Sequence, residues 1–450
     1  MHEATWSAGE QSLSQKTQLF GHPAAIYLVA FAQCWERFSF YGIMGLLALY
    51  LTADANAGGL GWPASSALKL VGAYGAAAFI APAFGGWIAS RFWGDQRCIR
   101  VGSLLVIAGH VLLSVQALPG LAGAGQNLLF LSALGLIAAG TGLLKPATAS
   151  IVSRCYAPGD PRSDQGYVIF MVGIYSGSFL ANLVAGTMGE KLGWHYGFGA
   201  AAIGMTLGYG VYVLFARRLL GSIGSVADRV NAEHQAEDDK TVRATAHLIG
   251  FSLLTVLYTA CFFQDAGMLN LLVEGSADRV LLGFEVPATW LLSVSTLAFM
   301  TLAPLTSLLQ SRLKLDVYSQ QTVAFVLMSA AYAVLWLGST SIDGAGGKMS
   351  LGWFIAAYSL FGLADLHIWP VQLSTVARLA PKSHTSLYVG LWWVAAGVGI
   401  FLTGYIAAFA PILGSVTNLL LWIAATAAAA GVVALLLGRM FPSPNLSPLQ

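Results

Sequence analysis

The chain has 450 residues, of which 57% are hydrophobic and only 9% are charged. Soluble domains usually carry about a quarter charged residues, so this composition excludes an ordinary soluble protein and predicts a chain adapted to lipid. The formal net charge of +2 is uninformative about nucleic-acid or acidic partners, and the four cysteines form no CxxC or Cys/His cluster that would indicate a disulfide framework or a zinc site.

Apolar runs of the length that crosses a bilayer, about 20 residues, follow one another along the chain. Residues 1–23 are polar and lack the features of a signal peptide, so we expect a cytoplasmic tail there. The polar segment 219–244 is the predicted cytoplasmic linker between two six-helix bundles, 24–218 and 245–438, and 439–450 is the predicted C-terminal tail. The predicted spans fall near residues 24–51, 68–90, 99–118, 127–149, 166–188, 196–218, 245–272, 287–311, 319–338, 351–375, 386–409 and 412–438.

The distribution of basic residues predicts the orientation of these twelve spans. With the N-terminus inside, sixteen Lys and Arg residues fall in inner segments and only four in outer loops. Cytoplasmic loops are enriched in Lys and Arg, so the split favours both termini inside. Six spans, a charged central loop and six more spans resemble the pattern of the major facilitator superfamily, in which two bundles move around a substrate site.

Four charged residues interrupt the apolar runs. Glu36 and Arg37 are adjacent in the first run, Lys145 lies in the fourth, and Asp365 lies in the tenth with His367 close by. A charge at the centre of a bilayer costs about 2.5–3.5 kcal/mol on insertion scales, and such residues usually face a cavity or a partner. Glu36 and Arg37 alone are open to a second interpretation, a structural pair whose charges neutralise each other.

Two cations in the N-terminal half and one anion in the C-terminal half predict a substrate with separated charges. A carboxylate would bind Arg37 and Lys145, and an amine would bind Asp365. The same groups are also candidates for a proton relay, because desolvation and exchange of partners change their proton affinity.

Several segments resemble signatures of the proton-dependent oligopeptide transporter family. The resemblance covers both halves of the chain, in order and at the right spacing. The segments are QCWERFSFYG at 33–42, GTGLLKP at 140–146, FQ with LN in 263–270, DLHIWP at 365–370 with RLAP at 378–381, and GLWW at 390–393.

This resemblance implies the roles of the candidate site residues. Arg37 and Lys145 would receive the carboxylate of a peptide, and Asp365 would receive its amino terminus. The resemblance also implies that Glu36 helps to carry the proton. Asp365 and His367, a histidine that is unusual at this position in the family, are further titratable candidates for proton coupling. The remaining substrate-binding candidates are Tyr41, Gln264 and Trp392.

Other positions depart from the family pattern and predict a divergent member. Gln33 stands where the first acid of the E-x-x-E-R motif is usual, and the acid of the tenth helix is shortened to Asp365. Ser90, Ala147 and Tyr175 stand where the family usually has Asp, Asn and Asn. We therefore expect a substrate that differs from an ordinary di- or tripeptide, or altered proton coupling.

These patterns predict a secondary transporter of peptides or peptide-like zwitterions, driven by protons, in a bacterial inner membrane. The expected partners are a small-molecule substrate, protons and the lipid bilayer, with no cofactor, no metal and no nucleic acid. One alternative is a transporter or exporter of a siderophore, drug or modified metabolite, and another is a non-transporting membrane subunit or assembly factor. No nucleotide-binding, zinc-protease or hydrolase motif is present, so an enzyme is not expected.

Overall fold

The computed structural model describes residues 17–118, 124–156, 160, 162–225, 242–313, 315–342, 347–379, 385–410 and 412–440. The greater part of each predicted tail, 1–23 and 439–450, and of the predicted linker, 219–244, lies outside the described residues.

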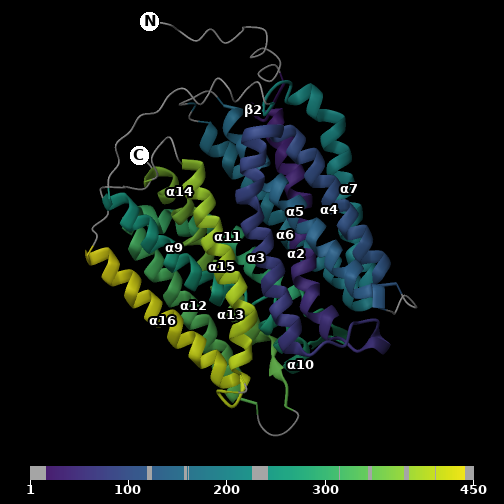
Figure 1. The fold of residues 1–450 in the computed structure, drawn as a ribbon. Helices are drawn as coiled ribbons and strands as arrows, with labels where there is room; N and C mark the ends of the chain where they lie inside the picture. Colours follow the sequence, from purple (N-terminus) through teal and green to yellow (C-terminus); the bar gives the residue numbers. More distant parts are fainter. Residues whose placement is uncertain are drawn as a thin grey trace, which may run out of the picture. The chain divides into compact units, whose positions relative to one another are not determined.

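Helices make up almost all of the described structure (Figure 1). The α-helices are α2 (Ala24–Thr52), α3 (Ala64–Ile88), α4 (Asp95–Gln116), α5 (Ala124–Arg154), α6 (Ser163–Thr187), α7 (Trp194–Leu219), α9 (Val242–Phe262), α10 (Met268–Ser276), α11 (Trp290–Leu313), α12 (Val317–Thr340), α13 (Leu351–Leu366), α14 (Trp369–Leu379), α15 (Thr385–Ile406) and α16 (Val416–Met440). Short helical segments are η1 (Ala55–Ala57), η2 (Ala89–Trp93), η3 (Met188–Leu192) and η5 (Ala407–Phe409), and two-residue strands are β1 (Gln18–Leu19), β2 (His22–Pro23), β3 (Ala277–Asp278), β4 (Val280–Leu281), β5 (Phe284–Glu285) and β6 (Met349–Ser350).

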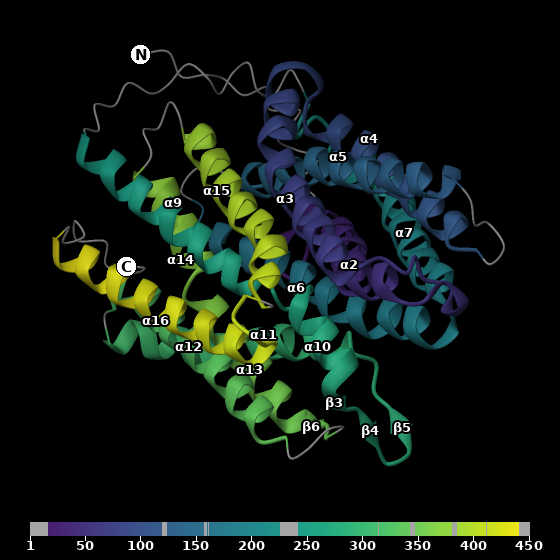
Figure 2. The same ribbon diagram turned by 60° about the horizontal axis from the view of Figure 1, so that its bottom comes forward.

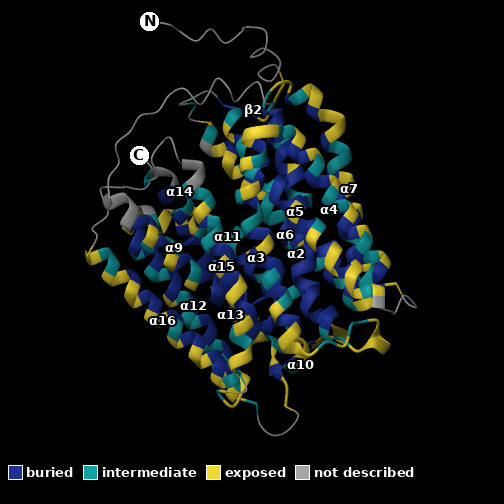
Figure 3. Ribbon diagram, in the orientation of Figure 1, coloured by how far each residue is buried: buried dark blue, intermediate teal, exposed yellow. Residues whose placement is uncertain are grey.

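Within the described ranges, ten helical segments are long and apolar enough to cross a membrane. Exposed residues lie along many of these helices (Figure 3), and they include large apolar side chains such as Ile203, Leu214 and Leu305, each more than 60% exposed. Apolar faces of this extent are costly in water and favourable in lipid. Helices also satisfy their own backbone hydrogen bonds, as a segment within lipid must. The predicted helical membrane architecture is confirmed, and the count of twelve spans stays a prediction.

The chain divides into two compact units. The first comprises Met1–Ile43 and Ile80–Ala236, and the second comprises Met44–Phe79 and Glu237–Gln450. Helices α2 and α3 therefore contribute to both units, because the division falls inside each of them.

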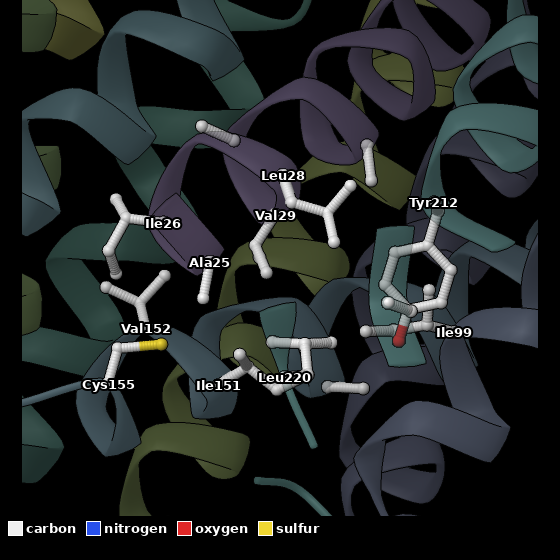
Figure 4. Packing of buried hydrophobic residues seen from close by; sticks show 14 of the residues in the cluster. Ala25, Ile26, Leu28, Val29, Ile99, Ile151, Val152, Cys155, Tyr212 and Leu220 are labelled. Carbon is white, nitrogen blue, oxygen red and sulfur yellow. The ribbon is translucent and has the colours of Figure 1, made fainter. Parts of the chain in front are cut away.

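Buried apolar side chains hold the first unit together. Figure 4 shows residues of α2, α4, α5 and α7 gathered in one cluster, among them Val29, Ile99, Val152 and Tyr212. Each of these four is at most 1% exposed. Burial of such side chains stabilises a structure by about 1.5–3 kcal/mol each relative to exposure in water, although in lipid the gain comes from packing rather than from water release.

Small residues let helices of this unit approach closely. A Cβ atom on Gly102 of α4 would lie 2.6 Å from the carbonyl oxygen of Gly140 on α5, and one on Gly140 would lie 2.5 Å from the oxygen of Gly102. Any larger residue at either position would force the backbones apart. The two glycines thus set the distance at which α4 and α5 cross, as small residues do in membrane helix pairs.

The hairpin β1–β2 is attached to the end of the first unit. His22 Nδ1 hydrogen-bonds with the hydroxyl of Tyr156, and Arg162 Nη1 donates to the carbonyl oxygen of Gly21. Arg162 also pairs with Asp160 at 2.7 Å, and its hydrogen bonds hold the pKa of the Asp160 carboxyl below its usual range.

The second unit contains the remaining helices and a short hairpin. Helices α12 and α16 lie side by side, as do α9 and α15 (Figures 1 and 2). Strands β4 and β5 form an antiparallel hairpin, next to which Arg279 pairs with Glu274 and Glu285 at 2.8 and 3.1 Å. Strand β3 pairs with β6 in parallel.

Two of the predicted spans are interrupted in the second unit. The run 245–272 is divided by a turn between α9 and α10, where Asp265 Oδ1 accepts a hydrogen bond from the backbone N–H of Ala266. The run 351–375 is divided between α13 and α14, just before Pro370. Proline lacks the N–H that would continue the ladder and disfavours helical geometry in the preceding residue, which explains the second break.

Candidate functional site

Glu36 and Arg37 form a buried ion pair on α2. Arg37 Nε donates to Glu36 Oε2 and Arg37 Nη2 donates to Glu36 Oε1, both at 2.6 Å. The two side chains are 0% and 4% exposed. Two parallel charge-assisted bonds are the strongest arrangement of this pair, and a buried pair needs such geometry to offset the cost of desolvation. In this state the guanidinium therefore already binds a carboxylate, that of Glu36.

Gln33 and Thr148 extend the ion pair into a hydrogen-bonded chain. Gln33 lies three residues before Glu36 on α2, so the two share one face of the helix. Its Nε2 donates to Glu36 Oε2, and Thr148 Oγ1 on α5 donates to Gln33 Oε1, both at 2.6 Å. All of these side chains are at most 1% exposed.

Lys145 and Tyr41 lie close to the same group. Lys145, on the turn of α5 before Thr148, interacts electrostatically with Arg37 and Glu36. The Arg37 Cζ atom lies 6.0 Å from the centroid of the Tyr41 ring, within the range of a cation–π contact. The structure thus brings together Glu36, Arg37, Lys145 and Tyr41 in the first unit, and their roles in transport stay a prediction.

Asp365 lies in the last turn of α13, directly before the helix break. Its Oδ1 accepts hydrogen bonds from the Tyr258 hydroxyl at 2.7 Å and from Trp369 Nε1 at 2.9 Å. His367, which the sequence places next to Asp365, instead hydrogen-bonds through Nδ1 with Gln310 Nε2 at 3.1 Å. Both of these partners are neutral donors, so neither supplies a counter-charge to the Asp365 carboxyl group.

Trp392 belongs to a polar network in the same unit. Its Nε1 donates to Gln372 Oε1 and to Thr255 Oγ1, both at 3.0 Å, and the Thr255 hydroxyl donates to Gln372 Oε1 at 2.6 Å. Gln264, in the turn between α9 and α10, donates to the carbonyl oxygens of Ala260 and Thr403, each at 3.2 Å. In this structure Gln264 therefore links the backbones of α9 and α15. Its predicted contact with substrate would require these hydrogen bonds to break.

Aromatic rings surround the tryptophan that contacts Asp365. The ring centroids of Trp392 and Trp393 are 4.7 Å apart, and those of Trp369 and Trp393 are 6.0 Å apart and stacked. Phe79 contributes a further ring, 5.5 Å from Trp393. A carboxylate beside aromatic faces suits an organic ammonium group, which both can attract.

Several residues of these networks were not predicted from the sequence. They are Thr148, Thr255, Tyr258, Gln310 and Gln372, which are polar but uncharged. Hydroxyl and amide side chains are common in membrane helices, so each gave only a weak signal, in contrast to a charge in an apolar run. Among the residues that the structure describes, no group of three or more His, Cys, Asp or Glu could hold a metal ion.

Buried charges on spanning helices, with helices broken beside them, are the hallmarks of a multi-pass membrane transporter. The comparison with protein families gives the same class and a name for it. The family model described as PTR2, POT family, matches residues 96–220 and 218–418, so the chain belongs to the POT family, as its motifs predicted.

Curated relatives and solved structures agree with this assignment. The chain is 28% identical over 454 residues to the peptide transporter YePEPT of Yersinia enterocolitica, which covers 86% of this chain and 88% of that protein. It is also 28% identical over 449 residues to a di-/tripeptide transporter of Lactococcus lactis subsp. cremoris, with coverage of 85% and 88%. A crystal structure of a peptide transporter POT in complex with sulfate is similar with a TM-score of 0.86 at 26% identity, over 96% of this chain and 98% of that one. The predicted major-facilitator-type fold is confirmed, and the chain is a transporter and not an enzyme.

Proposed function

We propose that this protein is a secondary active transporter that moves peptides or peptide-like zwitterions by alternating access, coupled to protons. The observation that carries the proposal is the distribution of buried charge. The first unit holds Arg37 and Lys145 around one carboxylate, and the second holds Asp365 between neutral donors. The relatives named as peptide transporters support the same substrate class, as does a POT structure with alafosfalin at 26% identity.

The Glu36–Arg37 pair gives the substrate carboxylate a definite route into the site. A carboxylate that replaces Glu36 on the Arg37 fork makes the same two bonds, so the guanidinium is never left without an anion. Lys145 adds a second cation to which either carboxylate is attracted. Tyr41 would line this part of the site, and Gln264 and Trp392 would line the part near Asp365.

Proton coupling follows from the same exchange. Once the substrate binds Arg37, Glu36 loses its counter-ion, and an unpaired buried carboxylate favours the protonated form. Asp365 would take or release a proton in the same way when an amine leaves or binds. His367 would take part by changing its protonation, which would alter its hydrogen bond with Gln310 at the end of α13, close to Asp365 in the chain.

We also propose the finer membrane arrangement. Helices α2 and α9, of 29 and 21 residues, would complete the ten apolar spans to twelve, with both termini on the cytoplasmic side. The functional domains would be the bundles 24–218 and 245–438, joined by the linker 219–244, in the bacterial inner membrane. The bacterial relatives support this location.

A second candidate function is transport of a non-peptide substrate with altered proton coupling. It is favoured by Gln33, which cannot titrate, and by the shorter acid Asp365. A transporter of this kind would keep the buried charges and respond to a different ligand.

The proposal is tested by uptake into proteoliposomes. Labelled dialanine and its N-acetylated form would be compared with and without an inward proton gradient, in wild type, Lys145→Ala, Asp365→Ala and the control Asp278→Asn, at an exposed residue of strand β3. Loss of a hydrogen bond to a charged group costs about 1.5–3 kcal/mol, so we expect KM for dialanine to rise about 10- to 100-fold in Lys145→Ala and Asp365→Ala.

Two comparisons make the outcome specific. Asp365→Ala should no longer prefer the free amine to the N-acetylated peptide, whereas Lys145→Ala should keep that preference. A wild type that ignores both peptides but transports another ligand, with both variants impaired, would favour the non-peptide substrate. Full activity of both variants would refute the assigned roles.

A further inference from the structure

The chain Thr148–Gln33–Glu36 has a direction set by charge. An ionised carboxylate can only accept hydrogen bonds, so Gln33 must present its Nε2 to Glu36 and its Oε1 to Thr148. This is the arrangement observed, with 2.6 Å between Gln33 Nε2 and Glu36 Oε2 and between Thr148 Oγ1 and Gln33 Oε1.

Thr148 has a second set of acceptors within reach. Its Oγ1 lies 3.1 Å from the carbonyl oxygen of Leu144 and 3.0 Å from that of Lys145, both on the preceding turn of α5. A hydroxyl group carries one hydrogen and two acceptor lone pairs. Thr148 can therefore donate to Gln33, as here, or donate to its own helix and accept from Gln33.

We propose that protonation of Glu36 reverses this chain by a flip of the Gln33 amide, and that Thr148 makes the flip possible. The incoming proton forms an O–H bond on Glu36, and no other covalent bond changes. That O–H donates to Gln33 Oε1, Gln33 Nε2 donates to Thr148 Oγ1, and Thr148 donates to a backbone carbonyl of α5. Every polar atom keeps a partner in both states, which a buried site requires.

This inference rests on the proposed proton-coupled transport and assigns Gln33 and Thr148 as positioning residues for it. The flip accompanies the exchange on the Arg37 fork: as the substrate carboxylate replaces Glu36 there, Glu36 takes up the proton and turns its O–H to Gln33. Other ionisable groups near Glu36 are Lys145 on α5, which acts on it electrostatically, and His110 on α4, which hydrogen-bonds with Ser39 of α2. On α6, Gly173 and Gly177 lie close to the backbone of α2. Tyr175, an ionisable residue, stands between these two glycines in the sequence.

The test is Thr148→Val, which keeps the shape of the side chain and removes the hydroxyl. Thr148 makes two hydrogen bonds when Glu36 is protonated and one when Glu36 is ionised. The Thr148→Val variant therefore loses more hydrogen-bond stabilisation in the state with protonated Glu36. Since one hydrogen bond contributes about 1 kcal/mol, the pH profile of gradient-driven peptide uptake should move about one pH unit to the acid side. Thr148→Ser keeps the hydroxyl and should show the wild-type pH profile. Thr148→Ala removes the hydroxyl without valine's second methyl group, so it should show the same acid shift as Thr148→Val and replaces that variant if valine packs poorly.

Counterflow of peptide at equal pH on both sides serves as the second readout, because it needs no net movement of protons. We expect it to stay within about twofold of wild type in Thr148→Val. The matched control is Thr206→Val on α7, whose hydroxyl bonds only within its helix to Ala202 and whose pH profile should not move.

Three results separate the possible failures. An unchanged pH profile in Thr148→Val would overturn the flip. Equal losses in uptake and counterflow without rescue by Thr148→Ser would show that the hydroxyl is merely structural and would overturn it as well. A wild type that transports peptide in neither assay would instead refute the proposed function on which the inference rests.

Discussion

At the scale of single residues, the indole N–H of Trp392 donates to two buried polar side chains of the second unit, Gln372 and Thr255. We expect Trp392→Phe to lower the stability of the protein by about 1–3 kcal/mol, because the buried acceptors on Gln372 and Thr255 each lose one hydrogen-bond donor and the smaller ring leaves a void. In a protein of this size the melting temperature should fall by several degrees, measured by thermal unfolding in detergent. The matched change Trp422→Phe, at a residue 47% exposed, should leave the melting temperature within about one degree. Equal effects of the two changes would contradict the structural role of the network.

How far the site could be predicted depended on charge. Arg37, Lys145 and Asp365 stood out because a charge in an apolar run is costly and needs a reason. The sequence left the Glu36–Arg37 pair open to a structural or a functional interpretation; the structure shows the ion pair, and its role in transport stays a proposal. Thr148 was missed because its contact with Gln33 depends on how α2 and α5 are rotated against each other, which no local pattern encodes.

At the scale of elements, the crossing of α4 and α5 depends on Gly140. We expect Gly140→Ala to lower the melting temperature, because its Cβ would lie 2.5 Å from the backbone oxygen of Gly102 and only a shift of a helix can relieve this contact. Overpacking costs about 1–3 kcal/mol, which exceeds the gain of up to about 1 kcal/mol from the helix preference of alanine.

Gly135 on the same helix provides the control. A Cβ there would meet nothing within 4 Å, so Gly135→Ala should keep or slightly raise the melting temperature. Thermal unfolding of both variants under one condition gives the comparison. If Gly140→Ala were as stable as Gly135→Ala, close contact between α4 and α5 would not limit their packing.

The positions of the helices were predictable because apolar runs of membrane length have few alternatives. Their interruptions were less so. Pro370 gave a local signal for the break between α13 and α14, but the run 245–272 contains no proline and reads as one helix. Its break depends on Gln264, which bonds backbone of both α9 and α15, and therefore on tertiary contacts.

At the scale of the whole molecule, the distribution of Lys and Arg predicts that β4–β5 faces outward and that the end of α7 faces the cytoplasm. The test starts from a cysteine-free protein in which serine replaces Cys34, Cys98, Cys155 and Cys261. Two variants of it each carry one new cysteine: Leu282→Cys at the fully exposed hairpin tip, and Arg218→Cys near the exposed end of α7. A membrane-impermeant maleimide should label Leu282→Cys in intact cells and Arg218→Cys only after permeabilisation, because seven spans separate an inner N-terminus from the hairpin. The reverse pattern would invert the topology. Labelling of both positions in intact cells would place them on the same side and refute the proposed count of spans.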